Sequence, residues 1–242
     1  MSAARPGDIA YLTGAWRGTE ASAGARPAAI GVKFDPNGAP LADPGNTVIC
    51  HLDPDSAAFD ALQAIQAALM AAPFAAQFTY LPPASFHMTV FEGVIDHQRS
   101  AERWPTALPL DAPIDRVTAH FDQALRDISL PRRYKLRAEG IYAGIGLRLT
   151  GSSPDEEAAL RRTRDRLAAA TGLRPPDHDS YVFHITLAYL LRWMEVEAAQ
   201  AVQALCATLF ARHADSLHDI TLGPPELCRF QTMHRFERLR YL

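Results

Sequence analysis

Two short apolar segments in the first half of the chain have the character of β-strands, and a helical pattern lies between them. Residues 47–52 are apolar and β-branched, and residues 86–94 are rich in strand-forming side chains. Between them, residues 57–71 carry apolar side chains at helical spacing, after the capping residues of an Asp-Pro-Asp-Ser turn and before a proline. This part of the chain therefore predicts a strand, a helix, a loop and a second strand.

The same order of elements recurs later in the chain. Residues 145–150 and 181–190 each predict one strand, and a helix to about residue 170 begins between them at the capping box of residues 153–156. In both copies about 40 residues separate the centre of the first strand from a histidine in the second. This internal duplication predicts two similar lobes.

Further elements surround the duplicated unit. Because helices and strands do not follow a strict βαβ rhythm, the pattern favours an α+β fold with largely antiparallel sheets. Residues 1–29 are predicted to form a flexible or loosely packed leader, and residues 30–242 a single bilobal domain. The additional elements are helices near 113–128 and 195–211, a strand near 133–141, and closing strands near 219–222, 227–233 and 235–242.

Both later strands carry a His-x-Thr motif. Side chains two positions apart in a strand share a face, so His87 lies beside Thr89, and His184 beside Thr186. With nine histidines in the chain, roughly half a match is expected by chance, so one copy alone is a weak signal and a structural histidine is the simpler reading. The two copies, however, hold the same place in the duplicated unit, 97 residues apart. We therefore interpret the pair as a candidate active site.

This combination of side chains suits chemistry at a phosphodiester. Two imidazoles can divide the proton transfers, one accepting a proton from the attacking oxygen and the other donating one to the leaving oxygen. Two hydroxyls can hold the non-bridging oxygens on which negative charge grows. The mechanism needs no metal and no cofactor.

The sequences FHMTV (residues 86–90) and FHITL (residues 183–187) closely resemble the two signature strands of the two-histidine (2H) phosphoesterase superfamily, which includes RNA 2′,5′-ligase-like proteins and 2′,3′-cyclic nucleotide phosphodiesterases. Segments 31–34 (GVKF) and 44–51 (PGNTVICH) are similar to a mainly bacterial branch of it. The resemblance implies a bilobal α+β fold in which two pseudo-symmetric lobes bring the signature strands together across a cleft.

The resemblance also implies roles for individual residues. His87 and His184 would be the acid/base pair, and Thr89 and Thr186 the phosphate-binding hydroxyls. The expected partner is a small nucleotide or an RNA-end phosphodiester. Which histidine is the acid does not follow from a symmetric pair.

Four further residues are weaker candidates for substrate binding. His51 would approach the cleft if its strand neighbours the first signature strand, although a lone strand histidine is more often structural. Arg133 and Lys135 share one strand face and Tyr134 lies on the other, so they would supply cations or a stacking ring. A solvated strand face explains the two cations equally well.

Composition narrows the class of protein. The net charge is −3 and the isoelectric point is near 6.3, whereas proteins that coat duplex nucleic acid usually exceed about 9. Three cysteines without a CxxC spacing indicate neither a disulfide framework nor a zinc site and favour a reducing cytoplasm. The longest apolar run, residues 67–76, is too short to span a membrane. The sequence does not indicate an oligomeric state.

Three functional hypotheses follow. The first is a metal-independent phosphodiesterase that acts on a cyclic or 2′,5′-linked phosphodiester. The second is a nucleotide- or RNA-end-binding module with little turnover, for which two proton-transfer groups would be unnecessary. The third is a metallohydrolase with His51, His87 and His184 as ligands, against which stands the absence of a carboxylate from either motif.

Overall fold

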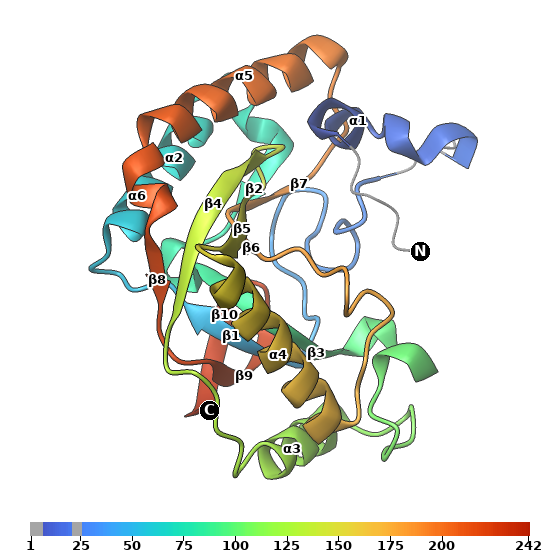
Figure 1. Cartoon of the computed structure of the whole chain (residues 1–242). Coiled ribbons are helices and arrows are strands. Elements are labelled where there is room, and N and C mark those ends of the chain that lie inside the picture. Colours follow the sequence, from blue (N-terminus) through green and yellow to red (C-terminus); the bar gives the residue numbers. More distant parts are fainter. Residues whose placement is uncertain (1–6, 21–25) are drawn as a thin grey trace.

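The structure, a computed structural model, describes residues 7–20 and 26–242. Its centre is an eight-stranded sheet in the order β10-β9-β1-β3-β6-β5-β4-β8, in which all neighbours are antiparallel (Figure 1). Two further short strands, β2 and β7, form a separate antiparallel pair. The strands are β1 (Gly45–His51), β2 (Phe78–Tyr80), β3 (His87–Ile95), β4 (Tyr134–Tyr142), β5 (Gly146–Gly151), β6 (His184–Thr186), β7 (Ala188–Leu190), β8 (Ile220–Leu222), β9 (Glu226–Thr232) and β10 (Arg235–Tyr241).

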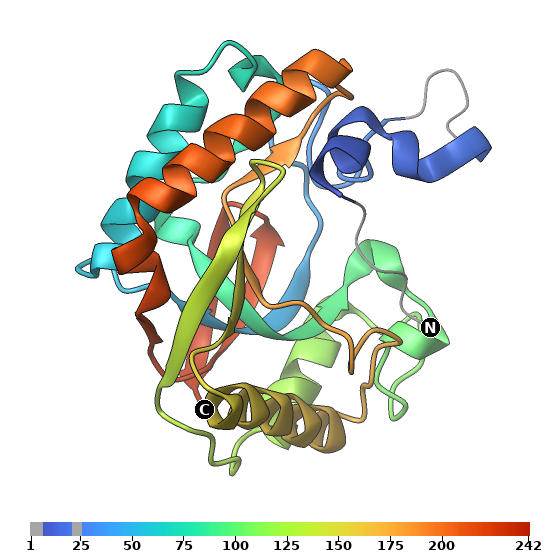
Figure 2. The same cartoon turned by 45° about the horizontal axis from the view of Figure 1, so that its top comes forward.

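Helices gather in two groups around the curled sheet. In both views α2, α5 and α6 lie together on one side, while α3 and α4 lie together at the other end (Figures 1 and 2). The short helix α1 packs against α5. The helices are α1 (Asp8–Thr13), α2 (Ala57–Met70), α3 (Ile114–Ala124), α4 (Pro154–Thr171), α5 (Val196–Arg212) and α6 (Ala214–His218).

The sheet has an internal two-fold pattern about its centre. Reading outward from the β3/β6 seam, β1 corresponds to β5, β9 to β4 and β10 to β8. Helix α2 follows β1, as α4 follows β5. The α+β fold and the duplication are therefore confirmed, and the two lobes are halves of one continuous sheet. The halves meet where Met88 pairs with Ile185.

Local signals account for the ends of the two duplicated helices. Helix α2 begins after Ser56, whose side chain accepts the backbone N–H of Phe59. Helix α4 begins after Ser153, whose hydroxyl accepts the N–H of Glu156 at 3.2 Å, and it ends at Gly172 with φ of 70°. These caps are the ones that the sequence predicts.

The segment predicted as one strand over residues 181–190 is broken in two. The N–H groups of Leu187 and Ala188 both donate to the carbonyl of Ile145, at 2.8 and 3.1 Å. The chain therefore leaves the main sheet after β6, and β7 pairs with β2 instead. The helix predicted near residues 113–128 is also shorter, since α3 ends at Ala124.

Part of the predicted leader is ordered. Helix α1 buries Leu12 completely, and Asp8 accepts the backbone N–H of Ala143 at 3.0 Å. An apolar contact and a hydrogen bond therefore fix this helix, which corrects the expectation of loose packing for residues 8–13. Residues 1–6 and 21–25 of the leader lie outside the described residues. The boundary at residue 30 stays a prediction.

The three cysteines are buried and free, which agrees with the absence of a disulfide framework. Among the described helices, none has both the length and the apolar character required to cross a bilayer.

Candidate active site

The two signature strands lie side by side at the centre of the sheet, and their His-x-Thr faces line one cavity. Its volume is about 130 Å³, and His87, Thr89, His184 and Thr186 all contribute to its wall. The structure thus brings together the four residues that the sequence singles out, from positions far apart in the chain.

Both histidines are oriented in the same way. Nδ1 of His87 lies 2.7 Å from the carbonyl oxygen of Ser85, and Nδ1 of His184 lies 2.8 Å from that of Val182. Because a carbonyl only accepts, each Nδ1 carries the proton in these bonds. In the neutral ring the lone pair therefore lies on Nε2, the tautomer that a general base at Nε2 requires. Each ring is held by the backbone two residues before it.

The environment of His87 disfavours its charged form. Burial lowers the pKa of His87 from 6.5 to about 4; its hydrogen bond to Ser85 opposes this shift, while the neighbouring His51 and His184 add to it. The phenyl ring of Phe236 stands over the imidazole, with 4.2 Å between ring centroids. His87 is thus neutral at neutral pH.

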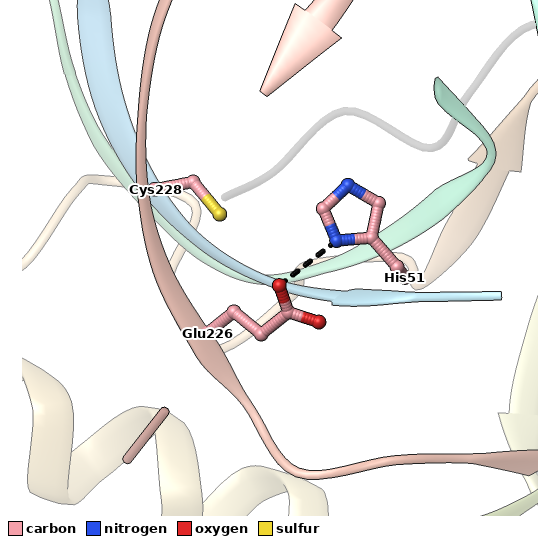
Figure 3. A group of neighbouring side chains, drawn as sticks. All are labelled: His51, Glu226 and Cys228. Carbon is pink, nitrogen blue, oxygen red and sulfur yellow. Dashed lines mark hydrogen bonds and ion pairs between the residues drawn. The ribbon is translucent and has the colours of Figure 1, made fainter. Parts of the chain in front are cut away.

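His51 lies next to the site, because β1 and β3 pair so that His51 is opposite His87. The two rings are 6.1 Å apart between centroids. Nδ1 of His51, however, contacts Glu226 Oε2 at 3.0 Å (Figure 3). Arg238 Nη1 donates to the same oxygen at 3.3 Å. His51 also lines a second cavity of about 540 Å³, together with Arg133. The structure places His51 beside the catalytic candidates, and its role stays a prediction.

The other candidates on the strand of residues 133–141 have different surroundings. Arg133 is exposed at the second cavity, and the side chain of Lys135 is exposed to solvent. Tyr134 is completely buried, and its hydroxyl lies 2.8 Å from Thr163 Oγ1. The prediction of Tyr134 as a stacking ring is therefore wrong, because its face of β4 packs into the core.

Two groups of side chains among the described residues have the composition of a metal site. His51, Glu226 and Cys228 hold their ligand atoms within 4.8 Å of one another (Figure 3), and so do Asp165, His178 and Asp179. In the first group Glu226 is already paired with two basic side chains, and burial raises the pKa of the Cys228 thiol to about 12. A protonated thiol is a poor ligand.

The second group is likewise held by ion pairs. Asp165 contacts His178 at 3.0 Å and Arg174 at 3.2 Å. Both groups are therefore accounted for by protein contacts alone.

Sequence reasoning missed four residues around the cavity. Lys33, Glu92 and Tyr189 line the cavity itself, and Arg148 is the partner of His184 across β5 and β6. Burial raises the pKa of Glu92, with the charge of Asp177 adding to the effect. Arg148 had a visible signal: it precedes His184 by 36 residues, the same spacing as that from His51 to His87.

Comparisons with known proteins concern the family and the fold of the chain. The family model described as "2H-phosphodiest: Domain of unknown function (DUF1868)" matches residues 33–144, a range that includes His87 and ends before His184. The chain is also similar to a crystal structure of the conserved protein of unknown function ATU0111 from Agrobacterium tumefaciens str. C58, with 33% identity and a TM-score of 0.90. That similarity covers 98% of this chain and 99% of the other. None of the curated proteins matches. The chain belongs to the 2H phosphodiesterase family.

Proposed function

We propose that the protein is a metal-independent phosphodiesterase that hydrolyses a cyclic or 2′,5′-linked phosphodiester of a nucleotide or RNA end. The observation that carries the proposal is the symmetric lining of one cavity by two imidazoles and two threonines. Each imidazole has its Nδ1 proton held by a backbone carbonyl, which leaves proton transfer to Nε2.

The reaction divides two proton transfers between the two histidines. The hydroxyls of Thr89 and Thr186 donate hydrogen bonds to the non-bridging oxygens of the phosphodiester. Neutral His87 accepts a proton from water as the water oxygen bonds to phosphorus, and protonated His184 gives a proton to the sugar oxygen as its bond to phosphorus breaks. The lowered pKa of His87 favours it as the base in this direction. Solvent then returns the two rings to their starting states.

A metal-dependent mechanism would use Glu92, which lines the cavity, as a carboxylate ligand beside the two histidines. Among the described residues, however, the ligand atoms of these three side chains do not all lie within 4.8 Å of one another. The raised pKa of Glu92 also opposes this reading, because a metal binds the ionised carboxylate. Chelation separates the two mechanisms.

The test is a screen of 2′,3′-cyclic nucleotides and 2′,5′-linked dinucleotides with product identification, with initial rates from about pH 5 to 9 with and without EDTA. Acid–base catalysis predicts a bell-shaped profile that EDTA leaves unchanged. His87→Asn and His184→Asn should each lower the rate by about 10² to 10⁴. His218→Asn, at an exposed histidine at the end of α6, is the matched control and should retain the rate.

Other outcomes would overturn the proposal. Full activity of either cleft variant would refute the assignment of the pair. Activity lost on chelation and restored by a divalent cation would identify a metallohydrolase, and binding without product at any pH would identify a binding module.

A further inference from the structure

The two-fold pattern of the sheet places a basic residue opposite each catalytic candidate. His51 on β1 is the register partner of His87, and Arg148 on β5 is the register partner of His184. Each precedes its partner by 36 residues. His51 and Arg148 therefore occupy equivalent positions in the two halves of the site.

The two equivalent positions differ in what holds the side chain. His51 is bound to Glu226, a residue that is only 5% exposed. The guanidinium of Arg148 instead lies 4.2 Å from the centroid of the Tyr142 ring, and its Nε is buried without a hydrogen-bond partner among the described residues. The protein thus leaves this guanidinium incompletely satisfied, and its remaining N–H groups are the ones that would bind a ligand in the cavity.

Arg148 lines a third cavity, which we call the annex. Its volume is about 400 Å³, and it shares Lys33, His184 and Thr186 with the catalytic cavity. The annex therefore continues from the catalytic cavity on the side of His184. Its wall also includes the aromatic side chains Tyr11, Trp16 and Tyr142, together with Tyr189, which lines both cavities.

The volumes of the catalytic cavity and the annex indicate which part of the substrate each would hold. Sites for small-molecule ligands usually measure about 300 to 1,000 Å³. At about 130 Å³ the catalytic cavity holds the reacting group alone, whereas the annex, at about 400 Å³, has room for a larger part of the ligand. The part of the substrate beyond the reacting phosphate should extend past His184, where the aromatic side chains of the annex suit a nucleobase.

The charges of the annex indicate what that part carries. Arg148 and Lys33 both line it, and Nζ of Lys33 lies 5.5 Å from the centroid of the Tyr189 ring. Glu92 lies at the junction with the catalytic cavity, and its raised pKa weakens its negative charge. A guanidinium placed over a tyrosine ring presents a fork of donors that matches phosphate oxygens.

We propose that the annex binds a second phosphate through Arg148 and Lys33, so that the preferred substrates are nucleotides that carry a phosphate besides the reacting phosphodiester. This inference rests on the proposed function. It also gives the substrate a direction, because His51 is paired with the buried carboxylate of Glu226, whereas Arg148, at the equivalent position in the other half, lies over the Tyr142 ring.

The test compares adenosine 2′,3′-cyclic phosphate with the same compound bearing a 5′-phosphate. Loss of a charge-assisted contact is worth about 10- to 100-fold, so the 5′-phosphorylated substrate should show a kcat/KM higher by that factor. Arg148→Met should lower kcat/KM for the 5′-phosphorylated compound by about 10- to 100-fold more than for the unphosphorylated compound, and so remove most of this advantage. Arg148→Lys keeps the positive charge without the forked guanidinium, so it should retain part of the advantage of the 5′-phosphorylated substrate. Arg137→Met, at an exposed arginine on β4, is the control.

A binding measurement separates this inference from the proposed function. Adenosine 3′,5′-bisphosphate should bind more tightly than adenosine 3′-phosphate in calorimetry, and Arg148→Met should abolish the difference. Equal kcat/KM values for the two cyclic substrates with wild-type protein, or equal loss on both in Arg148→Met, would refute the annex and leave the hydrolysis intact. Arg148-dependent binding of the bisphosphate without hydrolysis of either substrate would retain the annex and refute the proposed function.

Discussion

Protonation of His87 should destabilise the folded protein. The unfolded chain binds this proton near pH 6.5, whereas burial lowers the pKa of His87 in the folded protein to about 4. Between these values the unfolded state holds one more proton, so stability falls as the pH falls from 6.5 to about 4 and no further below that. At about 1.4 kcal/mol per pH unit, the loss attributable to His87 amounts to about 3 kcal/mol.

The variant His87→Asn isolates this contribution. Its amide can still donate to the Ser85 carbonyl, which the imidazole Nδ1 does in the wild type, but it does not titrate. Urea unfolding followed by circular dichroism at about pH 7 and pH 4 gives the loss of stability for each protein. His178 and His234 also have pKa values lowered by burial, and their contributions are common to both proteins. The wild type should therefore lose about 3 kcal/mol more than the variant. An equal loss in the two proteins would refute the reasoning.

Two further predictions concern the phosphate-binding hydroxyl and the packing of β3. Thr186→Val removes one hydrogen bond to the phosphodiester, so kcat/KM should fall about 10-fold. The control Thr208→Val, on the exposed face of α5, should leave kcat/KM unchanged. Equal values of kcat/KM in the two variants would exclude Thr186 from the site. Gly93→Ala places a Cβ against the backbone and side-chain oxygens of Asn46, so the free energy of unfolding, measured by thermal unfolding, should fall by about 1–3 kcal/mol. Gly223→Ala is the control, because its Cβ meets open space. Unchanged unfolding of Gly93→Ala would contradict the close strand approach.

Much of the fold could be predicted because local rules decide it. Strand alternation and the two serine caps give β1, α2, β3, β5 and α4 nearly to the residue. Alternation does not say which face of a strand is buried against the core. That is why alternation leaves Tyr134, on a correctly predicted strand, among the weaker candidates for substrate binding, although its hydroxyl packs against Thr163 in the core.

The missed parts of the site depend on pairings between distant segments. His51 contacts Glu226 across 175 residues of sequence, a partnership that exists only once β1 and β9 are neighbours. Strict alternation puts Glu92 on the face opposite His87, but β1 and β3 shift register between Val48 and Ile49. A shift of one residue exchanges the faces of a strand, and it brings Glu92 to the cavity wall. No local pattern announces such a shift.

The order of the strands has a consequence for synthesis on the ribosome. The half of the sheet that contains β1 and β3 is completed by the hairpin of β9 and β10, which comes after the whole of the second half. Chains generally fold from the N-terminal side as they emerge. Until that hairpin emerges, one edge of β1 lacks its neighbour and offers unpaired backbone groups to other chains. The nascent protein should thus depend on chaperones at this stage, and a chain truncated before residue 226 should aggregate.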